Sequence, residues 1–226
     1  MMPSRFDFDA IAVGYDSWYN SPVGERMDQQ EKKAVERFLP SPDDYTRVLE
    51  VGPGTGHWTR WFSEKGFHVT GIDVSAEMIS VARSKQIRNA AFIQEDFISA
   101  DVRGKFDMAV AITSLEFIPD CTAALNKMKS LVRPGGIILA GVLNRYSYMG
   151  LTRIIRGGKD PVFHRAHFFS WYELKKILKT LGPSVVTGST FALPYESLLC
   201  TAEFLDRAGS LVAPCLGNFL VGKVTV

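Results

Sequence analysis

The sequence predicts an α/β fold in which helices flank a mostly parallel sheet, and three observations support this. Short apolar runs alternate with amphipathic segments between about residues 46 and 143, which is typical of βαβ units. A glycine-rich turn separates the first apolar run from the first amphipathic segment. The chain of 226 residues is long enough for one α/β domain with a full core, so we expect a single domain over residues 1–226.

Seven apolar runs have the length and composition of strands. They are short and bounded by Gly, Pro, Asp or Ser, which favours strands over buried helices. The predicted strands are residues 46–51, 67–73, 90–94, 106–112, 137–143, 185–191 and 218–226. The fifth is expected to begin after a turn formed by Arg133-Pro134-Gly135-Gly136.

Helices are predicted where apolar residues recur at intervals of three and four. Ser75 is suited to cap the N-terminus of one helix, and Ser170-Trp171-Tyr172-Glu173 has the form of a capping box for another. The predicted helices cover residues 25–39, 57–65, 121–132, 170–181 and 195–209, and a further helix after Ser75 is expected to carry Met78, Ile79 and Ala82 on one face. Residues 144–169 show no clear period and are predicted to be irregular.

Composition and charge exclude several classes of protein. The net charge of +2 lacks the strong basic excess of a dedicated nucleic-acid binder, so no nucleic-acid partner is expected. Cys121, Cys200 and Cys215 are widely spaced, which predicts neither a metal site nor a disulfide framework. No apolar run reaches the roughly 18–20 residues of a membrane span, and the first residues do not resemble a signal peptide. We therefore expect a cytoplasmic protein without membrane contact.

The segment Leu49-Glu50-Val51-Gly52-Pro53-Gly54-Thr55-Gly56 lies between a strand and a helix, where nucleotide-binding turns occur. Glycines let a ligand approach the backbone closely, and the helix that follows presents free N–H groups. Asp73, at the end of the next strand, is suited to bind ribose hydroxyls. The G-x-G-x-G spacing differs from that of dinucleotide sites, and no Lys-Ser/Thr follows as in a P-loop. The residues alone thus predict an adenosine-type ligand.

Five segments in this order resemble the motifs of class I, Rossmann-like, S-adenosylmethionine-dependent methyltransferases. They are Glu50-Val51-Gly52-Pro53-Gly54-Thr55-Gly56, Gly71-Ile72-Asp73-Val74-Ser75 with Met78, Glu95-Asp96-Phe97, Phe106-Asp107-Met108-Ala109-Val110, and Leu131-Val132-Arg133-Pro134-Gly135-Gly136. Each is weak alone, but together they span residues 46–143 with the spacing of that family. The resemblance implies a seven-stranded, mostly parallel sheet with an antiparallel last strand, and S-adenosylmethionine as cofactor.

The resemblance also implies roles for single residues. The three glycines would pass against the methionine part of the cofactor, Asp73 would bind its ribose, and Asp96 with Phe97 would read its adenine. A Tyr-Asp segment such as Tyr15-Asp16 often covers the cofactor in this family. The implied cofactor contacts are Tyr15, Glu50, Gly52, Gly54, Gly56, Asp73, Val74, Met78, Asp96, Phe97 and Ile112.

The substrate should lie beyond the carboxyl ends of the strands, where open α/β sheets bind ligands. Three segments are expected there: a lid within residues 1–40, the loop after the fourth strand, and a flap at residues 144–169. The candidate substrate contacts are Tyr19, Ser114, Glu116, Asn144 and Arg145. For each, a packing or surface role is the alternative.

The predicted reaction is transfer of a methyl group to a small-molecule acceptor. Because the cofactor is already activated, the protein has mainly to orient the reactants and exclude water. Glu116 and His167 are the candidate catalytic residues, and no metal is expected. An RNA or protein methyltransferase, a non-catalytic S-adenosylmethionine-binding protein and a nicotinamide-dependent oxidoreductase are the alternatives. The sequence does not indicate an oligomeric state.

Overall fold

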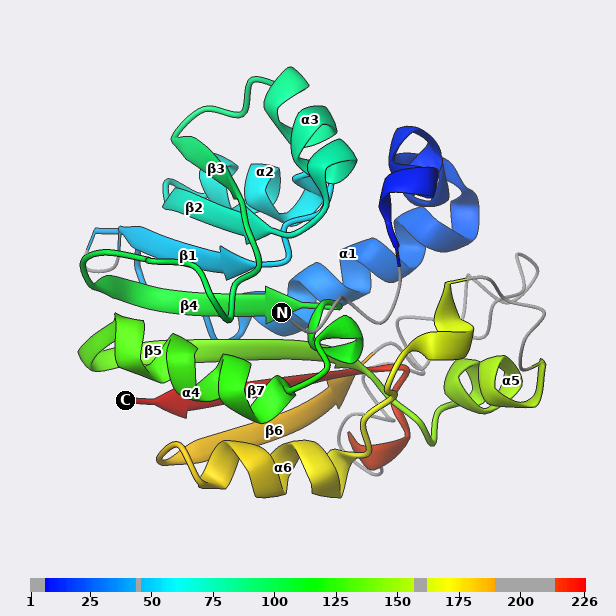
Figure 1. Ribbon diagram of the computed structural model, residues 1–226. Coiled ribbons are helices and arrows are strands. Elements are labelled where there is room, and N and C mark those ends of the chain that lie inside the picture. Colours follow the sequence, from blue (N-terminus) through cyan, green and yellow to red (C-terminus); the bar gives the residue numbers. More distant parts are fainter. Residues whose placement is uncertain (1–6, 44–45, 157–161, 190–213) are drawn as a thin grey trace.

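The structure is a computed structural model that describes residues 7–43, 46–156, 162–189 and 214–226. In these residues seven strands form one sheet in the order β3-β2-β1-β4-β5-β7-β6 (Figure 1). Neighbouring strands are parallel except where β7 pairs antiparallel with β5 and β6, which confirms the predicted sheet. The strands are β1 (Arg47–Val51), β2 (His68–Asp73), β3 (Ala90–Gln94), β4 (Phe106–Ile112), β5 (Val132–Leu143), β6 (Ser184–Ser189) and β7 (Phe219–Thr225).

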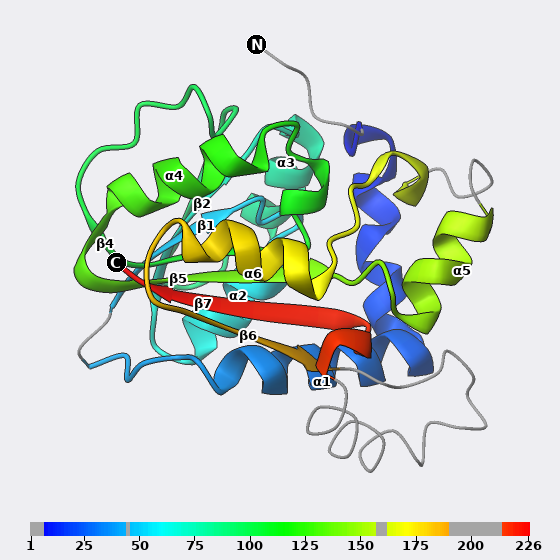
Figure 2. The ribbon, with the colours of Figure 1, turned by 90° about the horizontal axis from the view of Figure 1, so that it is seen from below.

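Helices cover both faces of the sheet. Figure 2 shows α1 and α2 on one face and α4 and α6 on the other. The α-helices are α1 (Pro22–Glu36), α2 (His57–Glu64), α3 (Ala76–Ser84), α4 (Cys121–Leu131), α5 (Tyr148–Arg156) and α6 (Trp171–Lys179). Four described 3₁₀ segments are η1 (Asp9–Asn20), η2 (Leu115–Phe117), η4 (Phe163–Arg165) and η6 (Pro214–Leu216).

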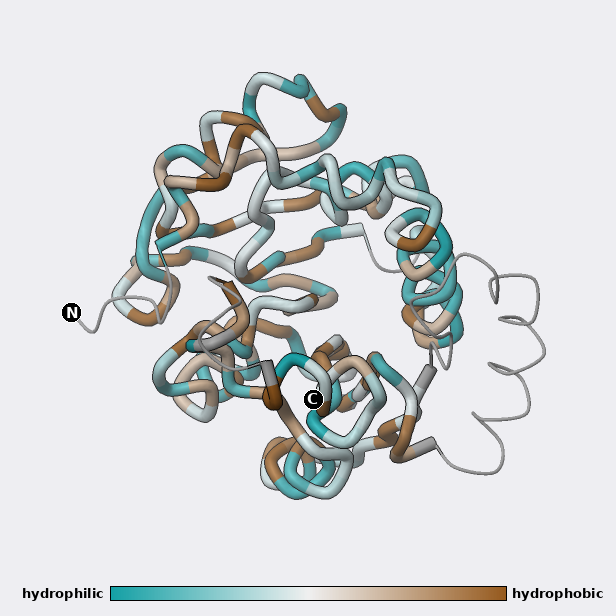
Figure 3. Tube along the Cα trace, turned by 90° about the vertical axis from the view of Figure 1, so that its right-hand side faces the viewer, coloured by the Kyte–Doolittle hydropathy of each residue, from teal (hydrophilic) through white to brown (hydrophobic). Residues whose placement is uncertain are grey.

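Two apolar clusters hold these layers together. On one face Val35 of α1 and Phe62 of α2 pack with Val48 and Met108 of the sheet. On the other face the cluster contains residues of α4 and α6, among them Ala124, Leu125, Met128, Leu174 and Leu178. Viewed onto the edge where the parallel strands end, the helix traces alternate between hydrophilic and hydrophobic segments (Figure 3). The amphipathic periods of the sequence thus correspond to one-sided burial of the helices.

Predicted caps are present where the sequence placed them. The Ser75 hydroxyl accepts a hydrogen bond from Met78 N at 3.1 Å, and the capping box of Ser170 and Glu173 is formed in both directions. Helix α1 begins at Pro22, earlier than predicted, because Ser21 caps it by accepting a hydrogen bond from Gly24 N. These local interactions fix where the helices begin.

Two predictions are corrected by the structure. The turn before the fifth strand is part of β5, which begins at Val132 and pairs with Phe106 before the register shifts to Met108 and Ile137. Residues 144–169 contain the helix α5. The sequence pattern did not predict this helix, because Ile154 and Ile155 are apolar but exposed. The predicted helix at 195–209 and the last two residues of the predicted strand 185–191 lie outside the described residues.

Gly141 tests how tightly the centre of the sheet is packed. A Cβ at Gly141 would lie 2.4 Å from Phe219 Cζ and 2.9 Å from Ile112 Cδ1. We expect Gly141→Ala to lower the free energy of unfolding by about 1–3 kcal/mol through overpacking, as measured by urea denaturation. Gly14→Ala is the control, since a Cβ at Gly14 meets nothing within 4 Å. Equal stabilities of the two variants would contradict this packing.

Candidate active site

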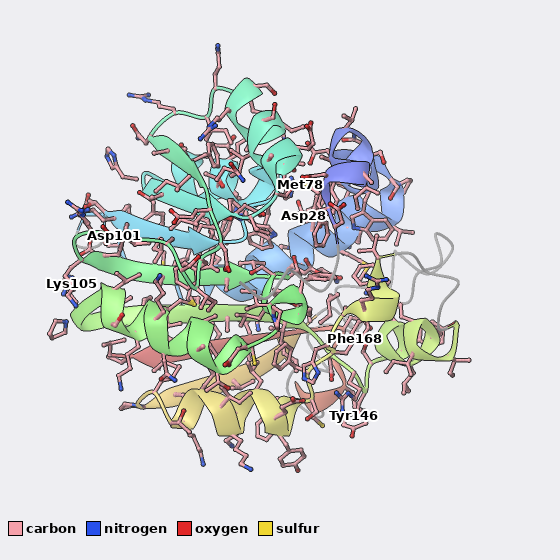
Figure 4. The ribbon with its side chains drawn as sticks, in the orientation of Figure 1. Asp28, Met78, Asp101, Lys105, Tyr146 and Phe168 are labelled. Atoms are coloured by element: carbon pink, nitrogen blue, oxygen red, sulfur yellow. The ribbon has the colours of Figure 1, made fainter. Side chains whose placement is uncertain are left out.

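A cavity of about 370 Å³ lies at the carboxyl ends of β1, β2 and β4. This volume is within the usual range of small-molecule sites, about 300–1,000 Å³. Figure 4 places Met78 and Asp28 near this end of the sheet, and Asp101 and Lys105 at the opposite end. The residues that line the cavity include Phe8, Tyr15, Tyr19, Gly52, Gly54, His57, Trp58, Asp73, Val74, Met78, Asp96, Phe97, Ile112, Thr113, Ser114 and Phe117.

The glycine-rich turn forms the floor of the cavity. Gly52, Gly54 and Gly56 have φ values of 73°, 54° and 80°, in the left-handed region that favours glycine. A Cβ at Gly52 would collide with Ser114 Cβ at 2.5 Å, whereas one at Gly54 would meet only Met78 Sδ at 3.9 Å. Gly52 therefore lets β1 and β4 approach each other, and Gly54 leaves space for a ligand against the backbone.

Asp73 links the end of β2 to this turn. One carboxylate oxygen accepts a hydrogen bond from Gly54 N at 2.9 Å, and the other accepts from Ser75 N at 3.0 Å. Burial raises the pKa of Asp73 above its ordinary value, although these backbone donors oppose the shift. The side chain lines the cavity, where its oxygens have lone pairs left to accept bonds from ligand hydroxyls.

Apolar side chains line the cavity near Asp73. Phe97 and Met78 are buried, and Val74 is half-exposed. Asp96 also lines the cavity, and its carboxylate accepts a hydrogen bond from Ile98 N at 3.0 Å. Apolar side chains beside a carboxylate suit a heterocycle that carries an amino group.

The segment η1 covers the cavity. The Thr55 hydroxyl donates to Asp16 at 2.6 Å, and the other carboxylate oxygen of Asp16 pairs with Lys85. The Ser75 hydroxyl donates to Asp9, which fixes the beginning of the segment. Tyr15 and Tyr19 line the cavity from this side.

Tyr15 stays a neutral phenol over the physiological range. Burial and nearby carboxylates, first that of Glu116, raise the pKa of Tyr15 to about 12. The side chain can therefore donate a hydrogen bond into the cavity at neutral pH.

Thr113 has a strained backbone at the end of β4. Its φ is 49°, in the left-handed region that a β-branched residue rarely adopts. Such conformations cost about 1–3 kcal/mol and cluster at functional sites. Thr113 lines the cavity, and its N–H donates to Gly141 O at 2.7 Å, which holds the strained turn in place.

Some predicted site residues lie outside the lining of the cavity. Glu50 is buried and accepts a hydrogen bond from the Thr59 hydroxyl at 2.5 Å, and burial raises its pKa to about 7. A Cβ at Gly56 would lie 2.9 Å from Ile87 Cδ1, so this glycine permits close packing between α2 and the end of α3. Glu50 and Gly56 therefore support the glycine-rich turn through packing outside the cavity.

The three predicted residues after β5 are also bound elsewhere. The Asn144 amide donates to the carbonyls of Cys215 and Gly217, at 2.7 and 2.8 Å. Arg145 Nε donates to Phe168 O at 3.1 Å. His167 Nε2 lies 2.6 Å from a carboxylate oxygen of Glu173. These side chains join the polypeptide around β5 rather than facing the cavity.

Glu116 lies behind the wall of the cavity. Its side chain is fully buried, and one oxygen accepts a hydrogen bond from Leu143 N at 2.6 Å. The other oxygen is buried without a hydrogen-bond partner among the described residues. Burial raises the pKa of Glu116 to about 7. The side chain turns inward because the 3₁₀ turn η2 directs it toward β5.

Sequence reasoning missed several residues of the cavity. Phe8 and Phe117 meet edge to face, with ring centroids 4.8 Å apart, and both belong to the lining. His57 and Trp58 begin α2 directly after the glycine-rich turn. A polar ring at the first position of the helix after this turn is a signal that could have identified His57.

Comparison with known proteins decides the family. The sequence model of the family described as "Methyltransferase domain" matches residues 23–187, which is more than half of the chain. The chain is a class I S-adenosylmethionine-dependent methyltransferase. The resemblance seen in the sequence motifs is thereby confirmed, together with the class of enzyme and its cofactor.

Two relatives illustrate the sequence similarity. An uncharacterised protein of Methanocaldococcus jannaschii is 30% identical over 175 residues, which cover 77% of this methyltransferase and 80% of that protein. A ubiquinone biosynthesis O-methyltransferase of Xanthomonas axonopodis is 34% identical over 149 residues. That alignment covers 60% of this chain and 62% of the relative, so the chain spans less than two thirds of its length.

Solved structures share the fold. A possible histamine N-methyltransferase of Thermotoga maritima has a TM-score of 0.76 at 22% identity, with 96% of each chain covered. A magnesium protoporphyrin IX methyltransferase of Synechocystis has a TM-score of 0.65 at 19% identity, with 97% of this chain and 96% of that chain covered. At these identities the likeness concerns the fold alone.

None of the described helices combines the length and the apolar character needed to cross a bilayer. Within the residues that the structure describes, no group of three or more His, Cys, Asp or Glu side chains is arranged to hold a metal ion.

Asp16 offers a test of how η1 retains a ligand. Asp16→Asn removes the charge that pairs with Lys85 and weakens the contact with Thr55. We expect S-adenosylhomocysteine to dissociate several-fold faster from this variant in stopped-flow tryptophan fluorescence, since the cover is held less firmly. The control is Asp101→Asn, which breaks an exposed ion pair with Arg103 at the opposite end of the sheet. Equal dissociation rates for both variants would contradict this role of η1.

Glu116 should make stability depend on pH. Burial raises its pKa from 4.5 to about 7, so between these values the folded chain keeps a proton that the unfolded chain loses. Its contribution to stability therefore falls as the pH rises from about 4.5 to about 7 and is level above that. Glu116→Gln keeps an acceptor for Leu143 N and removes the titration.

We expect the Gln variant to match the parent near pH 4.5 and to exceed its stability at pH 8, in urea denaturation followed across this range. Other buried carboxyls also titrate, so only the difference between variant and parent is used. Exposed Glu64→Gln is the control and should show no such difference. A Glu116→Gln curve parallel to that of the parent would show that the pKa of Glu116 is not raised in the folded chain.

Proposed function

We propose that this methyltransferase transfers the methyl group of S-adenosylmethionine to a small, largely apolar acceptor. The observation that carries the proposal is the covered cavity next to the glycine-rich turn. Its walls are mainly aromatic and aliphatic, and Tyr15 and Tyr19 of η1 form part of them. A cavity of this size and lining suits a small molecule.

The residues present fit the cofactor. The open space above Gly54 lets a ligand lie against the backbone, as the amino-acid end of the cofactor requires. Asp73 presents carboxylate oxygens to ribose hydroxyls, and Asp96 with Phe97 and Met78 forms the side suited to adenine. We assign these contacts, with Val74, Ile112 and Tyr15, to cofactor binding.

When bound, the cofactor supplies an activated methyl group on a sulfonium. The residues of the chain have to hold the acceptor in line with that group and keep water away. Phe8, Tyr19 and Phe117 provide the apolar surface for this, and the phenol of Tyr15 can orient a polar atom of the acceptor. Ser114 acts indirectly, because its hydroxyl donates to Val51 O at 2.7 Å and fixes the turn.

A sequence relative and two solved structures of similar fold support a small acceptor. The names of the relatives include a ubiquinone biosynthesis O-methyltransferase, a magnesium protoporphyrin IX methyltransferase and a possible histamine N-methyltransferase. Each name refers to a small molecule, although the molecules differ in size and charge. Neither Glu116 nor His167 lines the cavity, so the proposal places both in supporting positions.

The first test is calorimetric titration of the full chain with S-adenosylmethionine and S-adenosylhomocysteine. We expect Asp73→Ala to weaken both affinities at least tenfold, about 1.4 kcal/mol, because the ribose loses its carboxylate partner. The matched control is Asp101→Ala, an exposed aspartate at the opposite end of the sheet. Absence of binding to the parent chain would overturn the proposed function.

A screen for acceptors follows with the same protein. Phenols, thiols and amines carrying aromatic rings are incubated with methyl-labelled cofactor, and transfer is followed by mass spectrometry. We expect methylation of at least one of these classes and no salt-dependent binding of bulk tRNA. Methylation of tRNA or of protein in place of every small molecule would contradict the covered cavity as the acceptor site.

A further inference from the structure

His57 is a polar ring in the wall of an otherwise mainly apolar cavity. It is the first residue of α2, directly after Gly56, and it lines the cavity. Its ring stacks on that of Tyr19, with centroids 3.7 Å apart and an angle of 4° between the planes. The ring is thus held in one orientation by an aromatic neighbour that also lines the cavity.

A carboxylate from another helix holds one nitrogen of this ring. Asp28 Oδ1 on α1 lies 2.8 Å from His57 Nε2, and Asp28 Oδ2 accepts from Lys32 Nζ at 2.7 Å. Burial raises the pKa of Asp28, but hydrogen bonds from His57 and Lys32 outweigh burial and leave the pKa below its ordinary value. Asp28 is therefore an anion, and its Oδ1 can accept a hydrogen bond from Nε2–H of His57.

The orientation of the ring follows from this contact. When Nε2–H donates to Asp28, the neutral imidazole carries its lone pair on Nδ1. Lys32 Nζ also lies 3.0 Å from Nε2, and its ammonium has donors for both Nε2 and the other oxygen of Asp28. The contacts of Nε2 with Asp28 and with Lys32 favour opposite tautomers, and ¹⁵N spectra of the ring distinguish them. A base that lines a cavity and is oriented by a carboxylate on its far nitrogen is the arrangement of a general base.

We propose that His57 accepts the proton of the acceptor during methyl transfer and that Asp28 is the positioning residue that fixes its tautomer. This inference rests on the proposed function and identifies the acceptor as one with a dissociable proton, such as a phenol, a thiol or an ammonium. Glu116 and His167, the candidates from the sequence, do not line the cavity.

With His57 as the base, methyl transfer is a single displacement at the methyl carbon. The hydroxyl, thiol or ammonium of the acceptor gives its proton to Nδ1 of His57. The lone pair of the same acceptor atom forms the new bond to the methyl carbon, the carbon–sulfur bond breaks, and its electron pair remains on sulfur. The imidazolium then returns the proton to water, and Asp28 stabilises the charge of the ring until that happens.

A competing role for His57 would be to bind the carboxylate of the cofactor. The surroundings disfavour this role, because the Asp28 carboxylate contacts the ring and the Asp16 carboxylate lies near it. A further anion at the ring would be repelled by both carboxylates. Lys32 offsets one of these negative charges through its contact with Asp28.

The tautomer can be measured without knowing the acceptor. The full chain is labelled with ¹⁵N-histidine and bound to S-adenosylhomocysteine, and long-range ¹H–¹⁵N spectra are recorded at neutral pH. Signals of His57 are identified by their loss in His57→Asn, among the four histidines of the chain. We expect Nε2 to carry the proton and Nδ1 to be bare. We also expect Asp28→Asn to change the ratio of the two neutral tautomers of His57. A proton on Nδ1 in the neutral ring of the parent overturns the proposal.

Kinetics test the catalytic role with an acceptor of the screened phenols, thiols and amines. At neutral pH, His57→Asn should lower kcat at least tenfold, with recovery above the pKa of the acceptor itself, where no proton remains to be removed. Asp28→Asn should lower kcat less, since it acts through the ring. Exposed His68→Asn, at the start of β2, is the matched control.

Cofactor affinity separates this inference from the proposed function. We expect His57→Asn to bind S-adenosylhomocysteine within twofold of the parent, because the glycine-rich turn is intact. A tenfold loss of affinity would assign His57 to the cofactor and overturn its role as base, as would an unchanged kcat. Failure of the parent chain to bind the cofactor would instead overturn the proposed function.

Discussion

The close approach of the turn after β1 to the end of β4 is the constraint on which the site depends. Gly52 permits it, since any side chain there would occupy the position of Ser114 Cβ. Two hydrogen bonds then fix the turn: the Ser114 hydroxyl donates to Val51 O, and Gly52 N donates to Ile72 O at 2.9 Å. Because Asp73 also accepts from Gly54 N, three strand ends form one rigid floor. Ligand contacts made by backbone atoms require such rigidity.

The segment η1, which covers the cavity, is attached to the same glycine-rich turn. Thr55 lies within the glycine-rich turn and donates to Asp16 of η1, so the segment above the cavity is tied to the segment below it. The base proposed at His57 belongs to this connection as well, because Tyr19 of η1 stacks on its ring. A movement of η1 away from the glycine-rich turn would therefore break the stacking of Tyr19 on His57 as well as the hydrogen bond between Thr55 and Asp16. Coupling of this kind joins exclusion of water to assembly of the reacting groups.

The residues that line the cavity around the glycine-rich turn could be predicted from the sequence because their determinants are local. Positive-φ glycines, a serine cap and an aspartate at a strand end each act within a few residues of the motif that reveals them. Glu116, Asn144 and Arg145 were placed on the right loops, but the directions of their side chains depend on distant partners. Glu116 turns toward Leu143 N, and Asn144 toward Cys215 O, contacts between segments that no local pattern connects. His57 could have been found, whereas its partner Asp28 on α1 could not.

The charges around the cavity bear on how the reaction is driven. Asp73, Asp96 and Asp120 line it, and the described lining contains neither lysine nor arginine. A strongly negative site would stabilise a sulfonium in the ground state more than in the transition state, where its charge is being lost, and would slow transfer. Burial limits this effect by raising the pKa of Glu50 and of Glu116 to about 7, so both are partly protonated at neutral pH. The rate would then depend on positioning and on removal of the acceptor proton, and the latter is the step that we propose for His57.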